Sequence, residues 1–468
     1  MTGGSLTIGV GISEVKRGAK RFAASKWGVA LDYDLGGRAL RTSRILASLV
    51  IVAAVAFVYR AALSAYFFDD DFQWLAGTLT FTPARLIDVS HMGHFYRPIV
   101  DLFFTIGARF FGGSPTLLHL AILILHAANG LLLMALARTI MGSPTFGFLT
   151  ALFFVVQPAD VGAVAWVGAL AEPTGAFFGC LAILWFLAFR ENGSRALQIL
   201  SAASFGLALL THESSVVFVV LLALADWAFV DPSDRGAPRR QLRLESYWLH
   251  GLLLVAYLAV DLQINSRNYV VTEGHYTIGP HVITNTLEYI VALYVGRHDI
   301  ANYLIVIGVI GWTLLGKNRR ATFASLWLLL ALAPFVFFTW SNTSRYEYLP
   351  AMGFSMLLAE GVIGLGRVIG RRLSSSAAAV AVVVLAAAIT IRFALFAAGN
   401  VEDYAAEAED YRRYISAFRS MHGEVASRTQ NLVGPPTTRP HNHAFLNALV
   451  QWEYRDPTIQ LAPEAPLQ

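Results

Sequence analysis

The sequence predicts an all-α fold, a polytopic membrane helix bundle of about 11 transmembrane helices of about 20 residues each. Hydrophobic residues make up 56% of the 468-residue chain and charged residues only 14%, compared with roughly 25% charged residues in an ordinary soluble domain. The mean hydropathy of +0.55 agrees with this composition. Basic residues lie in short runs between apolar segments, so the net charge of +4 reflects the positive-inside rule and indicates no nucleic-acid partner.

Residues 1–42 are expected to form a basic N-terminal segment in the cytoplasm. The first long apolar run begins only near Ile45, after many lysine and arginine residues. A cleavable signal peptide has a short basic region followed closely by a short apolar one. We therefore expect the first helix to stay in the membrane as an anchor. The single cysteine, Cys180, excludes an internal disulfide framework.

Apolar runs that can cross a bilayer recur through residues 43–397, which we predict to be the transmembrane domain. The more polar stretch 98–111 is expected to be an interfacial helix on the outer face. The predicted spans lie near residues 45–65, 116–138, 144–158, 171–189, 196–211, 214–230, 247–263, 300–315, 321–340, 348–368 and 375–397.

The charges between these spans predict the topology. Every second loop carries most of the lysine and arginine, and such loops face the cytoplasm together with the N-terminus. The other loops would then be extracytoplasmic, in a multi-pass protein that we expect in a bacterial inner (plasma) membrane. The basic loops contain Arg138, Arg190 with Arg195, Arg235–Arg243, Lys317–Arg320 and Arg367–Arg372.

The C-terminal residues 398–468 are expected to form a short extracytoplasmic tail. Tyr404, Tyr411, Ile415 and Phe418 recur at helical spacing, so residues 401–423 are predicted to be an amphipathic helix against the membrane domain or its surface. The proline-rich end of the tail is expected to be extended or disordered.

The first outer loop contains three adjacent carboxylates, Asp69, Asp70 and Asp71, between aromatic residues. Their repulsion raises the pKa of at least one of them unless a cation or hydrogen bonds compensate. Such a cluster suits general-base catalysis or metal binding, and His91 and His94 further along the loop add two candidate metal ligands. The alternative is a solvated acidic loop, which the aromatic residues disfavour because they anchor at membrane interfaces.

Two arginines are candidates for binding a phosphate, because the guanidinium group presents a rigid fork of donors that matches phosphate oxygens. Arg345 precedes an outer helix start beside Tyr346, where backbone N–H groups would add to the site. Arg97 lies in the first outer loop. The alternatives are a snorkelling anchor for Arg345 and, for Arg97, an ion pair with Asp101 one helical turn on.

Further titratable residues lie at the outer ends of predicted helices, where ionisable groups tend to mark functional sites. Glu172 begins a helix, so both capping and catalysis can account for it. His212 and Glu213 join two helices, either as support for a site or as a buried structural pair.

A polar face occurs inside one predicted span. His119, His126 and Asn129 are separated by seven and three residues, so they share one side of the helix. Buried polar side chains inside a membrane need partners, and this face is therefore expected to form interhelical hydrogen bonds.

Taken in order, these motifs resemble the C-type (GT-C fold) membrane glycosyltransferases. The order is most similar to the branch of transmembrane, tetratricopeptide-bearing O-mannosyltransferases and their bacterial relatives, although the tetratricopeptide repeats are absent. The matching segments are FDDDF at 68–72, FYRPI at 95–99, HLAILILHAANGLLL at 119–133, QPADVGAVAWVGALAE at 157–172, LALLTHESSVVFVVLLALAD at 207–226 and SRYEYLPAMGFSMLLA at 344–359.

The resemblance implies an integral membrane glycosyltransferase that transfers a monosaccharide from a polyprenyl-phosphate-linked donor to an extracytoplasmic acceptor, which is a protein, a glycan or a lipid. Membrane lipids are its other expected partners. Asp70 would be the base on the acceptor hydroxyl. The full set of expected roles is catalysis by Asp70, Asp71 and Glu172, phosphate binding by Arg345, Arg97 and Tyr346, support by Asp69, His94, His212 and Glu213, and a divalent metal, if one binds, at Asp69, Asp71, His91 and His94.

This sequence departs from the family pattern at three places that bear on the acceptor. His212 stands where many members have lysine, Gln157-Pro158 stands where His-Pro is usual, and the segment Ala171-Glu172-Pro173 lacks the common Gly-Arg. The alternative function is a transporter or flippase of lipid-linked substrates. Transporters place their sites near the bilayer midplane, whereas the ionisable residues here gather at outer helix ends, which favours an enzyme.

Overall fold

The computed structural model describes residues 37–87, 95–229, 244–340, 344–436 and 441–462. These residues confirm the all-α fold class, because they contain helices and isolated β-bridges but no β-strand. The α-helices are α3 (Gly37–Val58), α4 (Asp71–Gly77), α5 (Pro98–Phe111), α6 (Pro115–Met141), α7 (Pro144–Val155), α8 (Val161–Val164), α9 (Ala171–Asn192), α10 (Arg195–Leu209), α11 (Phe218–Phe229), α12 (Trp248–Asn265), α13 (Tyr269–Thr272), α14 (His281–Leu293), α15 (Ile300–Leu315), α16 (Arg319–Leu332), α17 (Tyr348–Arg372), α18 (Ser375–His422) and α19 (His443–Glu453). The 3-10 helices are η1 (Arg60–Ser64), η2 (Thr78–Thr80), η3 (Pro83–Leu86), η4 (Pro158–Asp160), η5 (Val167–Leu170), η6 (Glu213–Val217), η7 (Leu244–Ser246) and η8 (Ser344–Glu347).

Proline and glycine set the limits of several helices. Helices α5, α6 and α7 begin at Pro98, Pro115 and Pro144, where the missing backbone N–H costs no hydrogen bond. Gly142 ends α6 in the left-handed conformation with φ of +67°, and its N–H donates to the carbonyl oxygen of Arg138 at 2.7 Å. These helix ends are therefore encoded by residues close to them in sequence.

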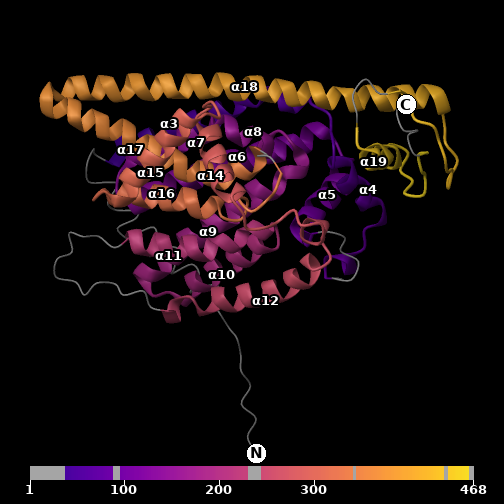
Figure 1. Cartoon of the computed structure of the whole chain (residues 1–468), viewed down its shortest axis with the longest axis horizontal. Coiled ribbons are helices and arrows are strands. Elements are labelled where there is room, and N and C mark those ends of the chain that lie inside the picture. The colour runs from indigo at the N-terminus through magenta and orange to yellow at the C-terminus, as the bar shows by residue number, and fades with distance from the viewer. Residues whose placement is uncertain (1–36, 88–94, 230–243, 341–343, 437–440, 463–468) are drawn as a thin grey trace, which may run out of the picture.

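The helices pack into one bundle with a large apolar core. Helix α6 packs on α7 and α9, α9 packs on α10, and α17 packs on α7, α16 and α18. Figure 1 shows α18 along one edge of the molecule and α12 along the opposite edge, with α9, α10 and α11 nearer to α12. Exposed leucine, isoleucine and valine side chains on α3, α15 and α18 are suited to contact with lipid.

In the described part of the chain, four helices are long and apolar enough to cross a membrane: Pro115–Met141, Val167–Asn192, Arg345–Arg372 and Ser375–His422. The pair Pro144–Val155 and Pro158–Val164, bent by 51°, would be a fifth. Shorter apolar helices at Arg44–Val58, Arg195–Leu209, Trp248–Ile264 and Ile300–Leu315 coincide with four more predicted spans. The total of about 11 spans stays a prediction.

Helix α18 differs from the expected span at 375–397 followed by a separate amphipathic helix. Residues Ser375–His422 form one continuous helix of 48 residues, which corresponds to about 72 Å at 1.5 Å per residue, against about 30 Å of hydrocarbon in a bilayer. Residue 398, the expected start of the tail, lies inside this helix. The charged second half, from Glu402 onward, runs along the part of the molecule that holds α5, α4 and α19 (Figure 1).

The tail contains a further helix at residues 443–453, beyond the prolines at 435, 436 and 440, that the sequence did not predict. These residues form α19, which packs on α4 and buries Leu446, Leu449 and Trp452. The helix begins at the N-cap Asn442, whose side chain accepts a hydrogen bond from the N–H of Ala444 at 2.9 Å. Burial of one apolar face therefore orders a segment whose neighbouring prolines indicated disorder.

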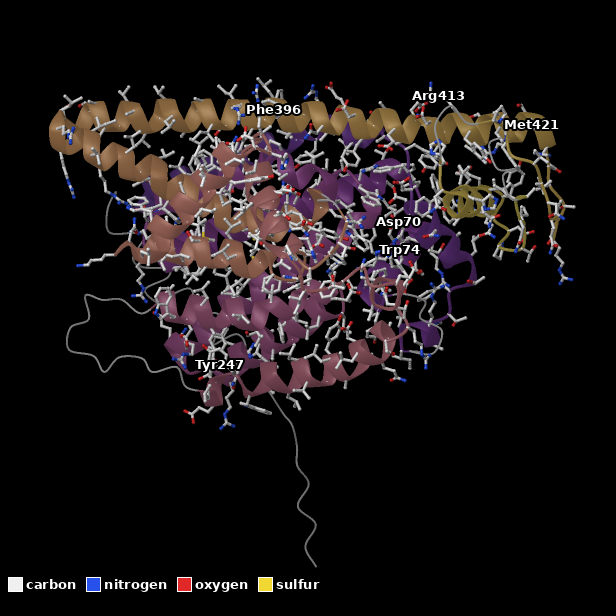
Figure 2. All side chains as sticks on the ribbon, viewed as in Figure 1. Asp70, Trp74, Tyr247, Phe396, Arg413 and Met421 are labelled. Carbon is white, nitrogen blue, oxygen red and sulfur yellow. The ribbon has the colours of Figure 1, made fainter. Side chains whose placement is uncertain are left out.

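The two ends of the bundle differ in chemistry. At one end, Arg320 donates to the carbonyl of Met141 at 2.7 Å, and Arg190 pairs with Asp226 at 3.2 Å. The other end holds α4 and the starts of α5, α9 and α17. Figure 2 shows Asp70 near this second end and Tyr247, which contacts Asp226, far from it. All the predicted site residues within the described ranges lie at the Asp70 end.

Candidate active site

A sharp turn between η1 and α4 presents the three carboxylates of the first outer loop. Asp69 has a left-handed backbone with φ of +50°, a conformation that aspartate adopts more readily than most residues. Asp70 then caps α4, which begins at Asp71. The neighbouring Phe68 and Phe72 are buried and fix the turn to the bundle. We call residues 68–72 the acidic turn.

Asp71 is a structural part of the acidic turn. Its side chain is fully buried. One carboxylate oxygen accepts a hydrogen bond from the N–H of Phe68 at 3.1 Å, and the other accepts one from the N–H of Gly168. Burial raises the pKa of this carboxyl, the charge of Asp70 adds to that rise, and the two backbone donors oppose it. Asp71 therefore joins the acidic turn to η5, at the start of the α9 span.

Asp70 faces the same segment but is held differently. A Cβ added to Gly168 would lie 2.4 Å from Oδ1 of Asp70, 3.0 Å from Oδ1 of Asp71 and 3.1 Å from Nε1 of Trp166. Both carboxylates and the indole therefore lie close to the backbone of Gly168, which has no side chain to keep them apart. Among the described residues, Asp70 receives no backbone N–H bond and forms no ion pair, so its carboxylate has free acceptor capacity.

Arg345 also contacts Trp166. Its guanidinium carbon is 4.6 Å from the centroid of the indole ring, a cation–π contact. Its Nη2 donates to the hydroxyl of Tyr346 at 3.2 Å, and Tyr346 is itself stacked on Phe335 at 4.6 Å. Within the described ranges, no carboxylate lies close enough to form an ion pair with Arg345. The side chain is thus held by aromatic rings while its positive charge stays uncompensated by direct contact.

Arg97 is in a different state, because it is already paired. Its Nε and Nη2 donate to both carboxylate oxygens of Glu213, at 3.1 and 2.8 Å. The expected alternative, a pair between Arg97 and Asp101, is not formed; Asp101 instead faces Arg85 at 3.6 Å. Burial disfavours a charge on Glu213, but the guanidinium of Arg97 outweighs this effect and lowers the pKa of that carboxyl.

Glu172 and His212 extend this ion pair toward α9. Nδ1 of His212 accepts a hydrogen bond from the N–H of Ser214 at 3.1 Å, so the ring proton sits on Nε2, which lies 3.3 Å from Oε1 of Glu172. Burial and, after it, the charge of Arg97 lower the pKa of His212 to about 3. A neutral His212 therefore lies next to Glu172, at the first turn of α9, and next to the Arg97–Glu213 pair.

The predicted interhelical face is confirmed for His126 and Asn129. Nδ1 of His126 lies 2.8 Å from the hydroxyl of Tyr348, and Nδ2 of Asn129 donates to the same hydroxyl at 2.9 Å and to the carbonyl of Pro173 at 2.8 Å. His119 is buried on the same helix. This network joins α6 to the starts of α9 and α17, the segments that carry Glu172 and Arg345.

The charges around Asp70 decide its protonation. Burial raises the pKa of the Asp70 carboxyl to about 6; Asp69 adds to the rise, while Arg345 and Arg97 oppose it. A carboxyl with this pKa is largely ionised at neutral pH and is still basic enough to accept a proton. Asp70 therefore has the properties of a general base beside two cations.

A cleft of about 730 Å³ opens next to Arg345 and Trp166. Its lining also includes Glu347 and, from α18, Phe396 and Tyr404. Those two positions bracket the point where α18 changes from apolar to charged, so the cleft lies next to the end of the apolar part of that helix. One wall is apolar and the other carries a cation, a combination suited to an amphiphilic phosphate.

A metal site is not assembled by the residues that the structure describes, which contain no group of three or more His, Cys, Asp or Glu side chains with suitable geometry. Asp69 binds Tyr411 and Asp71 binds backbone N–H groups, so these two carboxylates do not fit a shared cation. His91 and His94 lie outside the described residues. No step below depends on a metal.

Two residues of the site were missed by the sequence reasoning. Trp166 belonged to a matching segment but was given no role, yet its ring contacts Arg345 and its Nε1 lies near Gly168 together with the carboxylates of the acidic turn. Gly168 had no distinguishing signal at all, because its role depends on the approach of carboxylates that are distant in sequence. The structure brings together Asp70, Asp71, Arg97, Glu172, His212, Glu213, Arg345 and Tyr346 at one end of the bundle.

Comparison with known proteins finds likeness only in structure. No family model and no curated protein matches the chain. ArnT from Cupriavidus metallidurans matches both bound to undecaprenyl phosphate and in the apo state, with a TM-score of 0.51 at 14% identity, over 90% of this chain and 86% of that chain. The archaeal oligosaccharyltransferase AglB from Archaeoglobus fulgidus, in complex with an inhibitory peptide and a dolichol-phosphate, matches with a TM-score of 0.52 at 12% identity.

These likenesses show the fold. The match to AglB covers 88% of this chain and 64% of that chain, so the chain spans less than two thirds of the archaeal protein. Together with the match to ArnT over most of both chains, it shows that this chain has the GT-C membrane fold that the order of sequence motifs predicted.

Proposed function

We propose that this protein is an integral membrane glycosyltransferase that moves a monosaccharide from a polyprenyl-phosphate-linked donor to an extracytoplasmic acceptor. The observation that carries the proposal is that Asp70 and Arg345 both lie next to Trp166, Asp70 near its Nε1 and Arg345 over its ring. One is a carboxylate with free acceptor capacity, and the other is a cation without a carboxylate partner in the described residues. Sugar transfer from a phosphate needs such a base and such a cation.

The fold neighbours support the choice of donor. One ArnT structure holds undecaprenyl phosphate and the AglB structure holds a dolichol-phosphate, and both ligands are polyprenyl phosphates. In this chain, the cleft beside Arg345 has the matching chemistry, with an apolar wall on α18 for the isoprenoid chain and a guanidinium for the phosphate.

The proposed reaction forms one bond and breaks another. An acceptor oxygen forms a bond to the anomeric carbon while the bond from that carbon to the phosphate oxygen breaks. The proton of the acceptor hydroxyl goes to Asp70, and the electron pair of the broken bond stays on the polyprenyl phosphate. Negative charge therefore grows on the phosphate, where Arg345 and the hydroxyl of Tyr346 can stabilise it.

The remaining predicted residues support the roles of Asp70 and Arg345. Asp71 fixes the acidic turn to Gly168, and Glu213 orients Arg97 so that its charge stays near Asp70. Glu172, held next to His212, faces the same charges. We assign it to the acceptor side, because it lies on the side of the Arg97 pair and away from the cleft.

The orientation in the membrane follows from the charges at the two ends. The end with Arg190 and Arg320 would face the cytoplasm, and the end with Asp70 would face outward, as the positive-inside rule requires. The N-terminus would then be cytoplasmic and the C-terminal tail extracytoplasmic, in a bacterial inner membrane. The acceptor would meet the donor outside the cytoplasm.

The proposal is tested with purified protein in lipid nanodiscs, given a set of polyprenyl-phosphate sugars and a membrane extract as the acceptor source. The expected result is release of free polyprenyl phosphate together with a glycosylated product. The alternative function, a flippase of lipid-linked substrates, predicts that intact donor moves across the bilayer of a vesicle with no cleavage of the sugar–phosphate bond. That outcome would replace the proposed function.

The pH dependence of transfer should report Asp70. Because the free enzyme needs this carboxyl ionised and its pKa is about 6, kcat/KM should rise with pH through an inflection near that value and fall about tenfold for each pH unit below it. The check is a pH profile of kcat/KM at saturating acceptor. A profile flat between pH 5 and 7, where about one unit on each side of the inflection is sampled, would contradict the assignment of Asp70.

Gly168→Ala should impair transfer without unfolding the protein. The added methyl group would meet both carboxylates of the acidic turn and the indole of Trp166 at 3.1 Å or less, so these groups must move apart. Displacement of a catalytic group by about 1 Å costs on the order of 10²-fold in rate. The control is Gly361→Ala on α17, where the added methyl group meets nothing within 4 Å. Equal rates for the two variants would show that the packing at Gly168 is not needed.

A further inference from the structure

The charged half of α18 reaches the acidic turn from a distant part of the sequence. The hydroxyl of Tyr411 donates a hydrogen bond to Oδ1 of Asp69 at 2.5 Å. Its ring lies 5.2 Å from that of Phe72 and 4.6 Å from that of His441, and its side chain is buried. In Figure 2, Asp70 lies below α18, at a position along that helix between the labelled residues Phe396 and Arg413.

Helix α19 holds the same region from a second direction. The hydroxyl of Tyr66, just before the acidic turn, donates to Glu453 at 2.5 Å, and Glu453 also pairs with Arg419 of α18. Trp452 packs on Gly113 so closely that a Cβ there would lie 2.3 Å from the indole. The second half of α18 and α19 therefore contact the segment before α4, α4 itself and the turn after α5; we call them the C-terminal clamp.

The hydrogen bond from Tyr411 acts on the most constrained residue of the acidic turn. Asp69 has a φ of +50°, and a left-handed backbone at a residue other than glycine persists only where its surroundings hold it. The direction of the chain at Asp69 sets where Asp70 emerges, because Asp70 follows directly and caps α4. Tyr411 binds the side chain of Asp69 through a hydrogen bond to a carboxylate, which is a strong contact.

We propose that the C-terminal clamp is part of the active site and that Tyr411 is a positioning residue, which fixes Asp69 in its left-handed conformation and thereby places Asp70. The proposal rests on the proposed function, since it gives Tyr411 a role in the step that Asp70 performs. It also explains why α18 continues beyond the membrane, because the groups that the helix must hold lie there.

The test replaces Tyr411 with phenylalanine, which removes the hydroxyl and keeps the ring that packs on Phe72 and His441. The expected result is a fall of about tenfold in kcat, the size of effect that a small misplacement of a reacting group produces. The KM for the donor should change by less than about twofold, since the donor contacts at Arg345 are untouched. The matched control is Tyr454→Phe, which removes a hydroxyl of the same tail that donates only to Gly423 at 2.7 Å.

A coupling experiment separates positioning from general stability. Asp69→Gly keeps a residue that adopts positive φ but removes the carboxylate that Tyr411 binds. Adding Tyr411→Phe to this variant should change kcat no further, because the bond is already lost. An additional tenfold loss in the double variant, or wild-type kcat in Tyr411→Phe alone, would overturn the role of Tyr411.

A second measurement does not depend on the proposed function. Amide hydrogen exchange at residues 69–72 should be faster in Tyr411→Phe than in the wild type and unchanged in Tyr454→Phe, since the freed turn opens more often. If no sugar transfer is found but exchange responds in this way, the proposed function fails while the clamp stands. If transfer is found and exchange at the turn is unchanged, the clamp fails alone.

Discussion

Asp70→Asn should lower kcat by about 10³-fold, within the range that a general base contributes. The change is nearly isosteric and removes only the capacity to accept the acceptor proton. Because the described residues give the Asp70 carboxylate no backbone N–H bond and no ion pair, the variant should keep the melting temperature of the wild type. The measurement is the rate of polyprenyl-phosphate release at saturating donor, with the melting temperature determined on the same preparation.

Asp71→Asn is the matched control for this variant, and it should lower the melting temperature, which Asp70→Asn should leave unchanged. Both oxygens of Asp71 accept backbone N–H groups, so an amide would turn a donor toward a donor. A buried unsatisfied group of this sort costs about 1–3 kcal/mol, and the melting temperature should fall. Wild-type turnover in Asp70→Asn, with loss in Asp71→Asn beyond what unfolding accounts for, would move the base to Asp71.

Much of the fold could be predicted because its signals are local. The apolar runs, the prolines at Pro98, Pro115 and Pro144 and the glycine at Gly142 lie next to the helix ends that they determine. The continuity of α18 through residue 398 could not be predicted in the same way. The change from apolar to charged residues marks the end of the membrane, but it does not end the helix.

The candidate site could also be predicted only where its signals are local in the sequence. The acidic turn, Arg97 and Arg345 could be picked out, because charged residues beside apolar runs are conspicuous. Their partners could not, since the pairing of Arg97 with Glu213 instead of Asp101 depends on how α5 and η6 meet in space. The spacing of four residues suggested an ion pair between Arg97 and Asp101. In the structure, Arg97 instead donates to both carboxylate oxygens of Glu213.

Arg97 and Arg345 differ in whether a carboxylate partner offsets their charge, and this difference distinguishes the two sides of the site. Arg97 forms an ion pair with Glu213, which offsets part of its charge. Arg345 touches aromatic rings, which hold a guanidinium without neutralising it. The uncompensated charge therefore stands on the side of the cleft, where a phosphate would enter, and the compensated one stands toward Glu172.

This arrangement predicts that Arg345→Ala should reduce kcat by about 10²-fold or more, as the loss of one stabilising donor at a developing charge does. Arg345→Lys should cost about tenfold, because an ammonium makes a single contact where the guanidinium makes two and stacks less well on Trp166. Arg109→Ala, which removes another guanidinium that lies over an aromatic ring, 5.7 Å from Phe81 and outside this cluster, is the control and should retain the wild-type rate.

The kinetic pattern of the Arg345 variants distinguishes a phosphate ligand from a membrane anchor. Charge on the phosphate grows as the sugar departs, so the loss should appear in kcat as well as in the KM for the donor, while the KM for the acceptor stays within about twofold. A snorkelling anchor would lower the amount of inserted protein and leave the turnover of each inserted molecule unchanged. The measurement is transfer rate against donor concentration, normalised to folded protein in nanodiscs. If both Arg345 variants match the wild type, the phosphate must be bound elsewhere, and Arg97 becomes the residue to test by the same titration.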